Sequence, residues 1–429
     1  MEQKVNQAKG LKGRISPPGD KSISHRAVIL NAIAEGTAEI SNYLSGDDVM
    51  STVGCLKDLG VEIDVGPDKL VVHGVGLSGL REAQDILNAH NSGTTMRLLS
   101  GLLAAQSFLS TITGDESLRA RPMDRVISPL RLMGASIWGK NGDVKAPLVI
   151  QGADLHGIVY EMPVASAQVK SAILLAALYA QGNTTIIEPV KSRDHTERML
   201  RAMGAALNMS GNEVRLLPPT KSLQSMDVTV PSDISAAAYW LIAGAIHPDT
   251  RIELTGVGMN PTRSGIIDVL KEMGAKISIE NEGKQGGEPV ADIMIKSSEL
   301  IGVDIGGELI PRLIDEIPVI AVAAAMAKGT TTIRDAGELR VKESDRITAT
   351  VAELRKLGAK VEEIFDGMVI HGTGKLHGAE CDSRGDHRMA MTLGVAGLVA
   401  EGDTVVYNAE AVNISYPDFW DDLNELSAA

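Results

Sequence analysis

The sequence predicts an α/β protein of two lobes, each built from three copies of one unit that runs strand, helix, strand, helix, strand, strand. Two recurring patterns along the 429 residues support this prediction. The first is an apolar, Ala- and Leu-rich helical stretch followed by Gly and a Thr/Ile-rich strand. The second is a helix end of the form L-x-x-[LM]-G-[AV] followed by two short alternating strands. Because self-similarity along a chain indicates a repeat architecture, we expect each repeat to be one βαβαββ unit.

The apolar helical stretches recur roughly every 70 residues. They begin at Ala27, Arg97, Ser171, Ala237, Ile317 and Met389. Small side chains allow helices to pack closely, so these stretches are expected at the centre of each lobe. We assign them no chemistry and look for it in the loops that precede them.

Each helix end of the second pattern carries a Gly that suits the position just after a helix, where a positive φ is favourable for glycine. The sixth copy stops about 40 residues after Met389 and lacks the closing helix and strands. We expect a strand within GLKGRISPPG (10–19) to complete it. The predicted lobes are therefore 20–231 and 1–19 plus 232–429, the second closed by the N-terminal strand. Chain crossings are expected near Gly19 and Pro231, with ligands between the lobes.

The composition is that of a globular protein, with 44% hydrophobic residues and a formal net charge of −14. Binding to a nucleic-acid backbone needs a basic surface, so we expect no nucleic-acid partner. The first residues do not form a signal peptide, and no apolar run approaches the roughly 18 residues of a membrane span. Cys55 and Cys381 are too few for a disulfide framework. We expect a cytoplasmic protein with no membrane partner.

A polar cluster precedes each apolar helix. The clusters are GDKSISHR (19–26), NSGTTMR (91–97), SAQVK (166–170), PSDIS (231–235), PRLIDE (311–316) and GDHR (385–388). Helix N-termini present unpaired N–H groups and a positive dipole end, which suit phosphate and carboxylate. We interpret the clusters as anion-binding loops rather than ordinary helix caps.

Basic residues stand out in these loops and in those before the second helices: Lys21, Arg26, Arg97, Arg121, Arg193, Lys342, Arg346 and Arg388. Any one of them alone is more simply a solvated side chain or an ion-pair partner. The carboxylates of Asp315, Glu316, Glu343 and Asp345 are equally open to interpretation as caps or ion-pair partners. Recurrence at equivalent points of successive units favours a binding role for the cations, because random surface charge would not recur in this way.

Several other chemistries lack their motifs. Asp20 interrupts the Gly-Lys pair of a phosphate-binding P-loop, and the histidines form no HExxH or other zinc spacing. No G-x-S-x-G nucleophile elbow occurs, and neither cysteine lies in a polar loop. We therefore expect no metal and no cofactor, and interpret the polar residues as general acid–base groups among many cations.

The motifs together resemble the 5-enolpyruvylshikimate-3-phosphate synthase family, in its bacterial form, over essentially the whole chain. The matching stretches are PGDKSISHRA, NSGTTMRLL, RARPMDR, SAQVKSA, PRLIDEIP, LRVKESDRI and GDHRMAM. This resemblance implies the enolpyruvyl transferase fold, an inside-out α/β barrel type with two lobes of three βαβαββ units. It also implies transfer of the enolpyruvyl group of phosphoenolpyruvate to the 5-hydroxyl of shikimate 3-phosphate.

The resemblance implies two overlapping groups of substrate contacts. Shikimate 3-phosphate is expected at Lys21, Ser22, Arg26, Ser166, Gln168, Arg193, Asp315 and Lys342. Phosphoenolpyruvate is expected at Lys21, Gly93, Arg121, Gln168, Arg346 and Arg388. A glycine at position 93 would let backbone N–H groups approach a ligand closely.

The implied reaction adds the shikimate hydroxyl to phosphoenolpyruvate and then eliminates phosphate, so it needs a base and an acid. Our hypothesis is that Asp315 is the base and Glu343 the acid, with Lys21 as a competing proton carrier. The chain departs from some family members near its C-terminus, where AVNISYPDFW has Ile414 close to a position that they fill with Lys.

Two other functions compete with this one. A related enolpyruvyl transferase that acts on UDP-N-acetylglucosamine shares the fold but typically carries a Cys in the loop that is GDESLRARP here. A non-catalytic anion-binding protein of the same fold would tolerate the loss of Asp315 or Glu343. The complete set of acid, base and cations favours the shikimate enzyme, and the family suggests a monomer.

Overall fold

The computed structural model describes residues 1–217 and 222–428, and it divides into two compact units. Unit 1 comprises Met1–Pro18, Pro231–Lys284 and Pro289–Ala429, and unit 2 comprises Gly19–Val230 and Gln285–Glu288. Each unit has its own cluster of buried apolar side chains. The lobe boundaries expected from the sequence remain a prediction.

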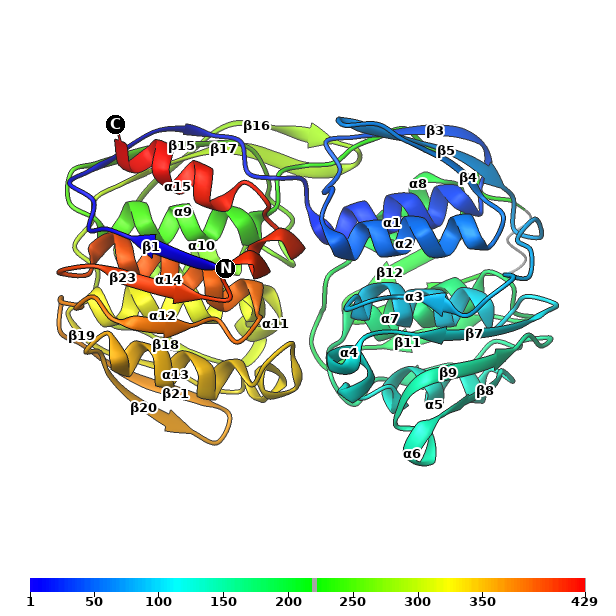
Figure 1. The fold of residues 1–429 in the computed structure, drawn as a ribbon. Coiled ribbons are helices and arrows are strands. Elements are labelled where there is room, and N and C mark those ends of the chain that lie inside the picture. Colours follow the sequence, from blue (N-terminus) through cyan, green and yellow to red (C-terminus); the bar gives the residue numbers. More distant parts are fainter. Residues whose placement is uncertain (218–221, 429) are drawn as a thin grey trace. The chain divides into compact units, whose positions relative to one another are not determined.

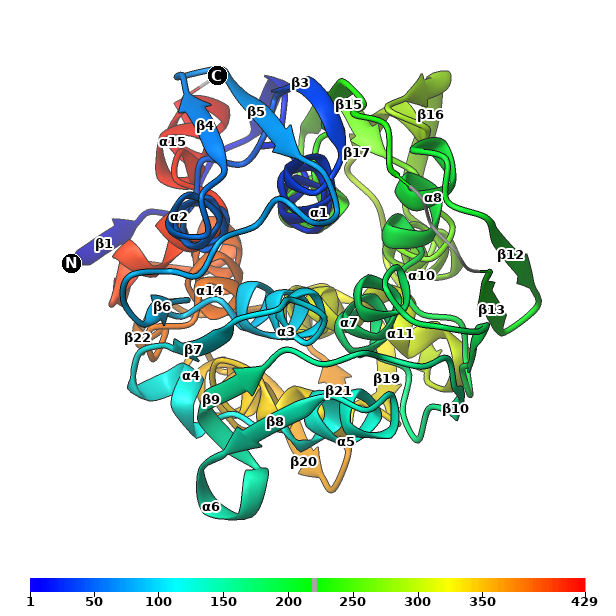
Figure 2. The same cartoon turned by 90° about the vertical axis from the view of Figure 1, so that its right-hand side faces the viewer.

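Unit 2 has three central helices, each nearly covered by protein: α1 (Lys21–Ala32), α3 (Gly93–Leu103) and α7 (Ala167–Ala177). Outer helices follow them in the chain: α2 (Asp47–Asp58), α5 (Asp124–Leu132) and α8 (His195–Ala202), with short α4 (Glu116–Ala120) and α6 (Lys140–Asp143). Figures 1 and 2 both show α1 and α2 side by side beneath β3, β4 and β5.

The strands of unit 2 form three four-stranded sheets. In spatial order they are β14 (Val228–Thr229), β3 (Glu35–Ser41), β5 (Lys69–Val75), β4 (Glu62–Val65); β6 (Leu87–Asn88), β7 (Leu109–Thr113), β9 (Lys145–Gln151), β8 (Ser136–Gly139); and β10 (Val159–Glu161), β11 (Thr184–Ile187), β13 (Glu213–Leu216), β12 (Leu207–Ser210). In each sheet the first pair is parallel and the other two pairs are antiparallel.

Unit 1 repeats the arrangement, as the layers of Figure 1 show. Its central helices are α9 (Ile234–Ile246), α12 (Ile317–Met326) and α14 (His387–Val399). The other helices are α10 (Gly265–Glu272), α11 (Ile310–Leu313), α13 (Arg346–Lys356) and α15 (Phe419–Ala428), with 3-10 turns η1 (Gly307–Leu309), η2 (Ile314–Glu316), η3 (Gly337–Val341) and η4 (Ala409–Ile414).

Two sheets of unit 1 have four strands and one has three. In order they are β16 (Lys276–Gln285), β17 (Glu288–Lys296), β15 (Thr250–Gly258), β2 (Leu11–Ile15); β18 (Asp304–Ile305), β19 (Gly329–Ile333), β21 (Gly367–Gly372), β20 (Lys360–Ile364); and β1 (Glu2–Val5), β23 (Thr404–Tyr407), β22 (Glu380–Asp382). The α/β fold of repeated βαβαββ units is confirmed.

The sixth copy differs from its expected form in two ways. It does have a closing helix, α15, which packs against β2. The strand within 10–19 does not complete it, because β2 instead pairs in parallel with β15 at the edge of another sheet. The earlier strand β1 pairs with β23 and takes the place that the prediction gave to β2. Both parts of that prediction were wrong.

The glycines of the recurring helix ends behave as predicted. Gly60, Gly134, Gly204, Gly274 and Gly358 all have positive φ, between 84° and 99°. Such backbone angles are strained for residues with a Cβ atom. These glycines therefore fix where each outer helix ends and where its first antiparallel strand begins.

The central helices of unit 2 pack closely because small residues line their contacts. A Cβ atom at Gly101 of α3 would lie 2.1 Å from the carbonyl oxygen of Ala172 in α7. Glycine has no Cβ atom, so only glycine allows the two backbones to pack this closely.

In the two described ranges, no helix is long and apolar enough to cross a membrane.

Candidate functional site

Five of the six polar clusters do act as helix caps, contrary to the expectation from the sequence; the cluster at 311–316 supplies no capping side chain. Asp20, Ser92, Ser166, Asp233 and Asp386 each accept a hydrogen bond from a backbone N–H in the first turn of the following helix. A side-chain oxygen at this position satisfies one of the otherwise unpaired helical donors. The first-turn N–H groups that these side chains occupy are therefore not free for an anion.

The two basic residues of α1, Lys21 and Arg26, form an ion pair and hydrogen bonds with oxygen atoms of neighbouring residues. Lys21 Nζ lies 3.0 Å from Asp48 Oδ2, and both side chains are largely buried. The Arg26 guanidinium donates to the Ser22 carbonyl (2.9 Å), to Thr196 Oγ1 (2.7 Å) and to Ser171 Oγ (2.8 Å). Three directions fix a planar guanidinium, so the orientation of Arg26 is determined by these contacts.

The same helix carries a buried histidine, His25. His25 Nδ1 shares a 2.7 Å hydrogen bond with Thr52 Oγ1, which in turn contacts Thr95 Oγ1 at 2.7 Å. Burial, with the nearby charges of Lys21 and Arg26, lowers the pKa of His25 well below its usual value. His25 is therefore a neutral, structural residue at physiological pH.

A second group in unit 2 surrounds Gly93. Arg97 Nη1 donates to Gln168 Oε1 at 2.6 Å, while Gln168 Nε2 donates to Thr94 Oγ1 at 2.9 Å. A Cβ atom at Gly93 would lie 2.7 Å from Arg97 Nη1 and 3.3 Å from Arg121 Nη1. The structure thus brings Gly93, Arg121 and Gln168 close to one another, together with Arg97.

Arg193 connects the α8 loop to α1. Its Nη1 donates to Ser22 Oγ at 3.4 Å. Ser166, the N-cap of α7, accepts from the Val169 N–H. The structure thus links Ser22 with Arg193, and it gives Ser166 a capping role alongside its predicted substrate contact.

In unit 1, the sequence-predicted residues gather around the guanidinium of Arg346. Its Nη1 lies 3.2 Å from Asp315 Oδ1, its Nη2 lies 2.6 Å from Glu343 Oε2, and its Nε lies 2.8 Å from Asp386 Oδ2. Arg346 itself is almost completely buried. Burial opposes its charge, but Asp386, Glu343 and Asp315 together raise the pKa of Arg346. The predicted base, Asp315, and the predicted acid, Glu343, therefore both form ion pairs with the same arginine.

Lys342 and Arg388 complete this group. Lys342 Nζ is 3.7 Å from Asp315 Oδ1. Arg388 is buried near Tyr239, Asp315, Glu316 and Asp233; burial opposes its charge, whereas Tyr239 and these carboxylates raise the pKa of Arg388. The three carboxylates thus balance the charge of a guanidinium that is always protonated.

The sequence-predicted site residues fall into two sets, and each set is assembled within its own unit. Lys21, Ser22, Arg26, Gly93, Arg121, Ser166, Gln168 and Arg193 belong to unit 2, and Asp315, Lys342, Glu343, Arg346 and Arg388 belong to unit 1. Sequence reasoning missed the acidic partners Asp48 and Asp386. Both lie in or beside the polar loops, but the sequence does not indicate which distant cation each carboxylate pairs with.

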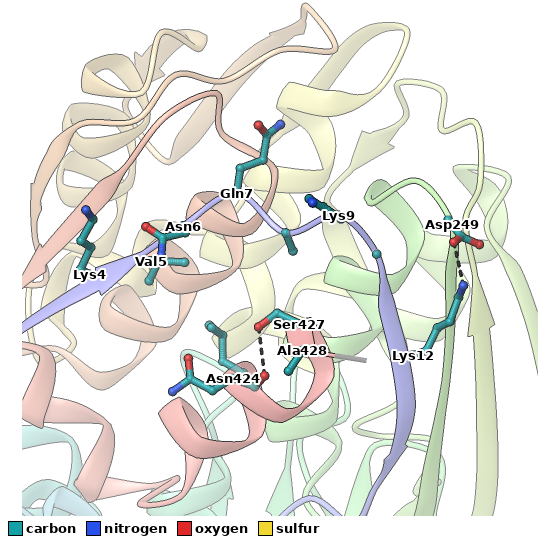
Figure 3. Close-up of a pocket in the computed structure, with 13 residues that line it drawn as sticks. Lys4, Val5, Asn6, Gln7, Lys9, Lys12, Asp249, Asn424, Ser427 and Ala428 are labelled. Carbon is teal, nitrogen blue, oxygen red and sulfur yellow. Dashed lines mark hydrogen bonds and ion pairs between the residues drawn. The ribbon is translucent and has the colours of Figure 1, made fainter.

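A pocket in unit 1 lies outside this set, between the N-terminal segment and the end of α15 (Figure 3). Its lining is Lys4, Val5, Asn6, Gln7, Ala8, Lys9, Gly10, Lys12, Asp249, Leu423, Asn424, Ser427 and Ala428. Lys12 is paired with Asp249 at 2.7 Å, and Lys4 with Asp403 at 2.6 Å. With two of its lysines neutralised, the pocket offers no match to the predicted chemistry.

Glu62, Asp64 and His73, on β4 and β5, have ligand atoms within 4.8 Å of one another. Both acidic side chains are exposed, and Thr37 Oγ1 and Asp64 Oδ2 already contact the two ring nitrogens of His73. Cross-strand ion pairs of this kind are ordinary on a sheet surface, so we assign no metal there.

Known proteins of one family match this chain over nearly its whole length. Residues 5–423 match the family model of EPSP synthase (3-phosphoshikimate 1-carboxyvinyltransferase). A 3-phosphoshikimate 1-carboxyvinyltransferase from Herpetosiphon aurantiacus is 53% identical and covers 100% of both chains. One from Desulforamulus reducens is 55% identical and covers 99% of each.

Solved structures of enolpyruvyl transferases have the same fold as this chain. An EPSP synthase from Acinetobacter baumannii superposes with a TM-score of 0.89 at 44% identity, covering 99% of this chain and 98% of that one. The enolpyruvyl transferase NikO from Streptomyces tendae, at 19% identity, has a TM-score of 0.80 over 99% of this chain and 96% of its own, which shows a shared fold. The family match supports the shikimate reaction over the UDP-N-acetylglucosamine alternative. The chain belongs to the EPSP synthase (3-phosphoshikimate 1-carboxyvinyltransferase) family.

Proposed function

We propose that the two sets of residues divide the work of the family reaction, the transfer of the enolpyruvyl group from phosphoenolpyruvate to the 5-hydroxyl of shikimate 3-phosphate. Both substrates are anions, which accounts for the number of arginines and lysines in the polar loops. The observation that best supports this assignment is the bracketing of Arg346 by Asp315 and Glu343. The proposed base and the proposed acid both contact this one fixed cation.

Shikimate 3-phosphate is assigned chiefly to the α1 and α7 loops. Lys21, Ser22 and Arg26 would meet its phosphate region, and Ser166, Gln168 and Arg193 would meet the rest of the molecule. Asp315 and Lys342 of unit 1 complete the set. The fixed orientation of Arg26 supports a phosphate contact, because a preorganised guanidinium loses little entropy on binding.

Phosphoenolpyruvate is assigned to Gly93, Arg121 and Gln168, together with Lys21 and the unit 1 arginines Arg346 and Arg388. The close approach of two guanidinium groups to Gly93 supports this assignment, since a phosphate and a carboxylate need several cations. We add Arg97, which holds Gln168 in place.

For proton transfer we propose Asp315 as the base that takes the 5-hydroxyl proton. Glu343 is the proposed acid for the methylene carbon. Lys21 is the alternative acid, because an ammonium carries its protons at neutral pH. The cations around Asp315 and Glu343 would stabilise charge that develops during addition and elimination.

The test is phosphate release from phosphoenolpyruvate by the purified protein. We expect release that depends on shikimate 3-phosphate and none with UDP-N-acetylglucosamine. Replacing Glu343→Gln and Lys21→Met separately then distinguishes the two acids, because only loss of the true acid should slow protonation in solvent-isotope exchange at the methylene carbon. Release with the sugar nucleotide alone would contradict the assignment.

We also propose that the protein acts as a cytoplasmic monomer without cofactor or metal, and that units 1 and 2 are the two lobes that hold the substrates. The composition and the family support these statements. Sedimentation of the purified protein, with and without both substrates, tests the oligomeric state.

A further inference from the structure

Lys170 is a buried cation that the proposed function leaves without a role. It lies near the start of α7, two residues after Gln168, and its side chain is completely buried. Its ammonium group is 2.8 Å from Glu188 Oε2 and 2.6 Å from Glu197 Oε1, and it also donates to the Ser192 carbonyl at 3.4 Å. Both glutamates are buried as well.

The three partners of Lys170 lie at the two ends and in the middle of one segment, residues 188–197. Glu188 follows strand β11, Ser192 lies in the loop, and Glu197 belongs to the first turn of α8. Glu188 also accepts from the Ser192 backbone N–H at 3.1 Å and from its hydroxyl. One ammonium group therefore holds residues 188–197 against α7.

The same segment carries two contacts to predicted substrate residues. Arg193, next to Ser192, donates to Ser22. Thr196, next to Glu197, accepts from Arg26 Nε at 2.7 Å and contacts Ser171, which follows Lys170 on α7. A shift of the segment would therefore turn Arg26 and Arg193 together.

Stability alone is a poor explanation for this cluster. Buried ion pairs lose much of their Coulomb attraction to desolvation, and apolar residues of similar size are often as stable in their place. One cation also meets two carboxylates here, and burial raises the pKa of Glu197. A charged cluster of this kind is better suited to fixing geometry than to stabilising a core.

We propose that Lys170 is a positioning residue, which through Glu188 and Glu197 holds the 188–197 segment so that Arg26 and Arg193 are oriented for the phosphate-bearing substrate. The inference rests on the proposed assignment of Arg26 and Arg193 to shikimate 3-phosphate. It does not give Lys170 any contact with substrate.

The test compares Lys170→Met, which keeps side-chain length without charge, with Glu197→Gln, which leaves one cation facing one anion. For Lys170→Met we expect the KM for shikimate 3-phosphate to rise about tenfold or more while kcat changes much less, because small displacements of binding groups are costly. Glu197→Gln should show the same selective rise, smaller in size. The KM for phosphoenolpyruvate should change less than that for shikimate 3-phosphate.

Asn31→Leu is the matched control. Asn31 is also buried in unit 2 and binds the backbone of Met226 through both its Nδ2 and Oδ1 atoms, but it lies in the last turn of α1 and contacts neither Arg26 nor residues 188–197 in any described hydrogen bond. Its loss should lower thermal stability and leave both KM values unchanged. An equal rise in the KM for shikimate 3-phosphate in Asn31→Leu would show that the effect is general destabilisation and would overturn the proposal.

If Lys170→Met does not fold, Glu197→Gln decides: a folded Glu197→Gln variant with the wild-type KM for shikimate 3-phosphate overturns the proposal. Hydrogen exchange of residues 188–197 gives a readout that does not need turnover, and it should be faster in either variant than in the wild type. Unchanged exchange rules out the positioning role. Wild-type protein that shows neither turnover nor calorimetric binding with shikimate 3-phosphate would instead refute the proposed function.

Discussion

Gly93→Ala is the sharpest test of where phosphoenolpyruvate binds. The added Cβ atom would lie 2.7 Å from Arg97 Nη1 and 3.3 Å from Arg121 Nη1. The first distance is too short for a real contact, so the end of the Arg97 side chain must move. The backbone has no reason to move, because Gly93 begins α3 and does not have a positive φ.

The magnitude follows from what Arg97 loses. Its Nη1 donates to Gln168 Oε1 at 2.6 Å, and a hydrogen bond from a charged group contributes about 1.5–3 kcal/mol. Loss of that amount corresponds to a roughly 10- to 150-fold change in an equilibrium constant. We expect a rise of this order in the KM for phosphoenolpyruvate, since Gln168 and both arginines surround the proposed site. The unfolding free energy should fall by less than this amount, because Ala favours a helix over Gly by up to about 1 kcal/mol.

The assay is steady-state phosphate release with either substrate varied, alongside thermal unfolding. Gly54→Ala provides the control, because Gly54 lies within α2 of the same unit and its added Cβ meets nothing within 4 Å. That variant should gain about 0.5–1 kcal/mol of stability with unchanged kinetics. The reasoning fails if Gly93→Ala keeps the wild-type KM for phosphoenolpyruvate while remaining folded.

Three further outcomes are expected. Asp315→Asn should reduce kcat by about 100- to 10,000-fold, the typical contribution of a general base, while the variant still folds; a folded variant with the wild-type kcat removes Asp315 from the mechanism. Because the pKa of His25 is lowered in the folded protein, the unfolded chain binds the extra proton first on acidification, so stability falls by up to about 1.4 kcal/mol per pH unit below the unfolded pKa near 6.5. Denaturant unfolding between pH 7.5 and 5.5, at roughly one-unit steps, should show a shallower loss in His25→Asn, and equal slopes would contradict this. Gly101→Ala should lower the unfolding free energy by about 1–3 kcal/mol, because its Cβ would strike the Ala172 carbonyl; a denaturation midpoint at or above that of the wild type would contradict the close packing.

The repeat architecture could be predicted because its signals are local. A helix of small apolar residues is recognisable within one window of sequence, and a glycine such as Gly204 marks a helix end through its own backbone angles. The cations of the site were predictable for a related reason: they occupy the same point of successive units. Each of these features is encoded within a few residues of where it acts.

Strand pairing between distant segments could not be predicted in the same way. The strand β2 precedes α1 in the chain but pairs with β15, and β14 precedes α9 but pairs with β3. The strand β2 therefore joins the sheet whose strand β15 follows α9, and β14 joins the sheet whose strand β3 follows α1. Local pattern shows that each segment is extended, but the choice of partner is decided by packing across more than 180 residues.

The acidic partners of the site illustrate the same limit and explain a feature of its charge. Asp386 caps α14 through one contact and binds Arg346 through others, so one carboxylate both caps the start of a helix and fixes a cation. Asp48 holds Lys21 in a comparable way. In a chain of net charge −14, such pairing keeps cations aligned without making the whole surface basic. If the proposed assignments hold, an arriving phosphate or carboxylate meets groups that are already oriented, and it gains interaction energy without having to order them first. The acidic composition and a site for two anionic substrates are therefore compatible, because local geometry rather than net charge decides what binds.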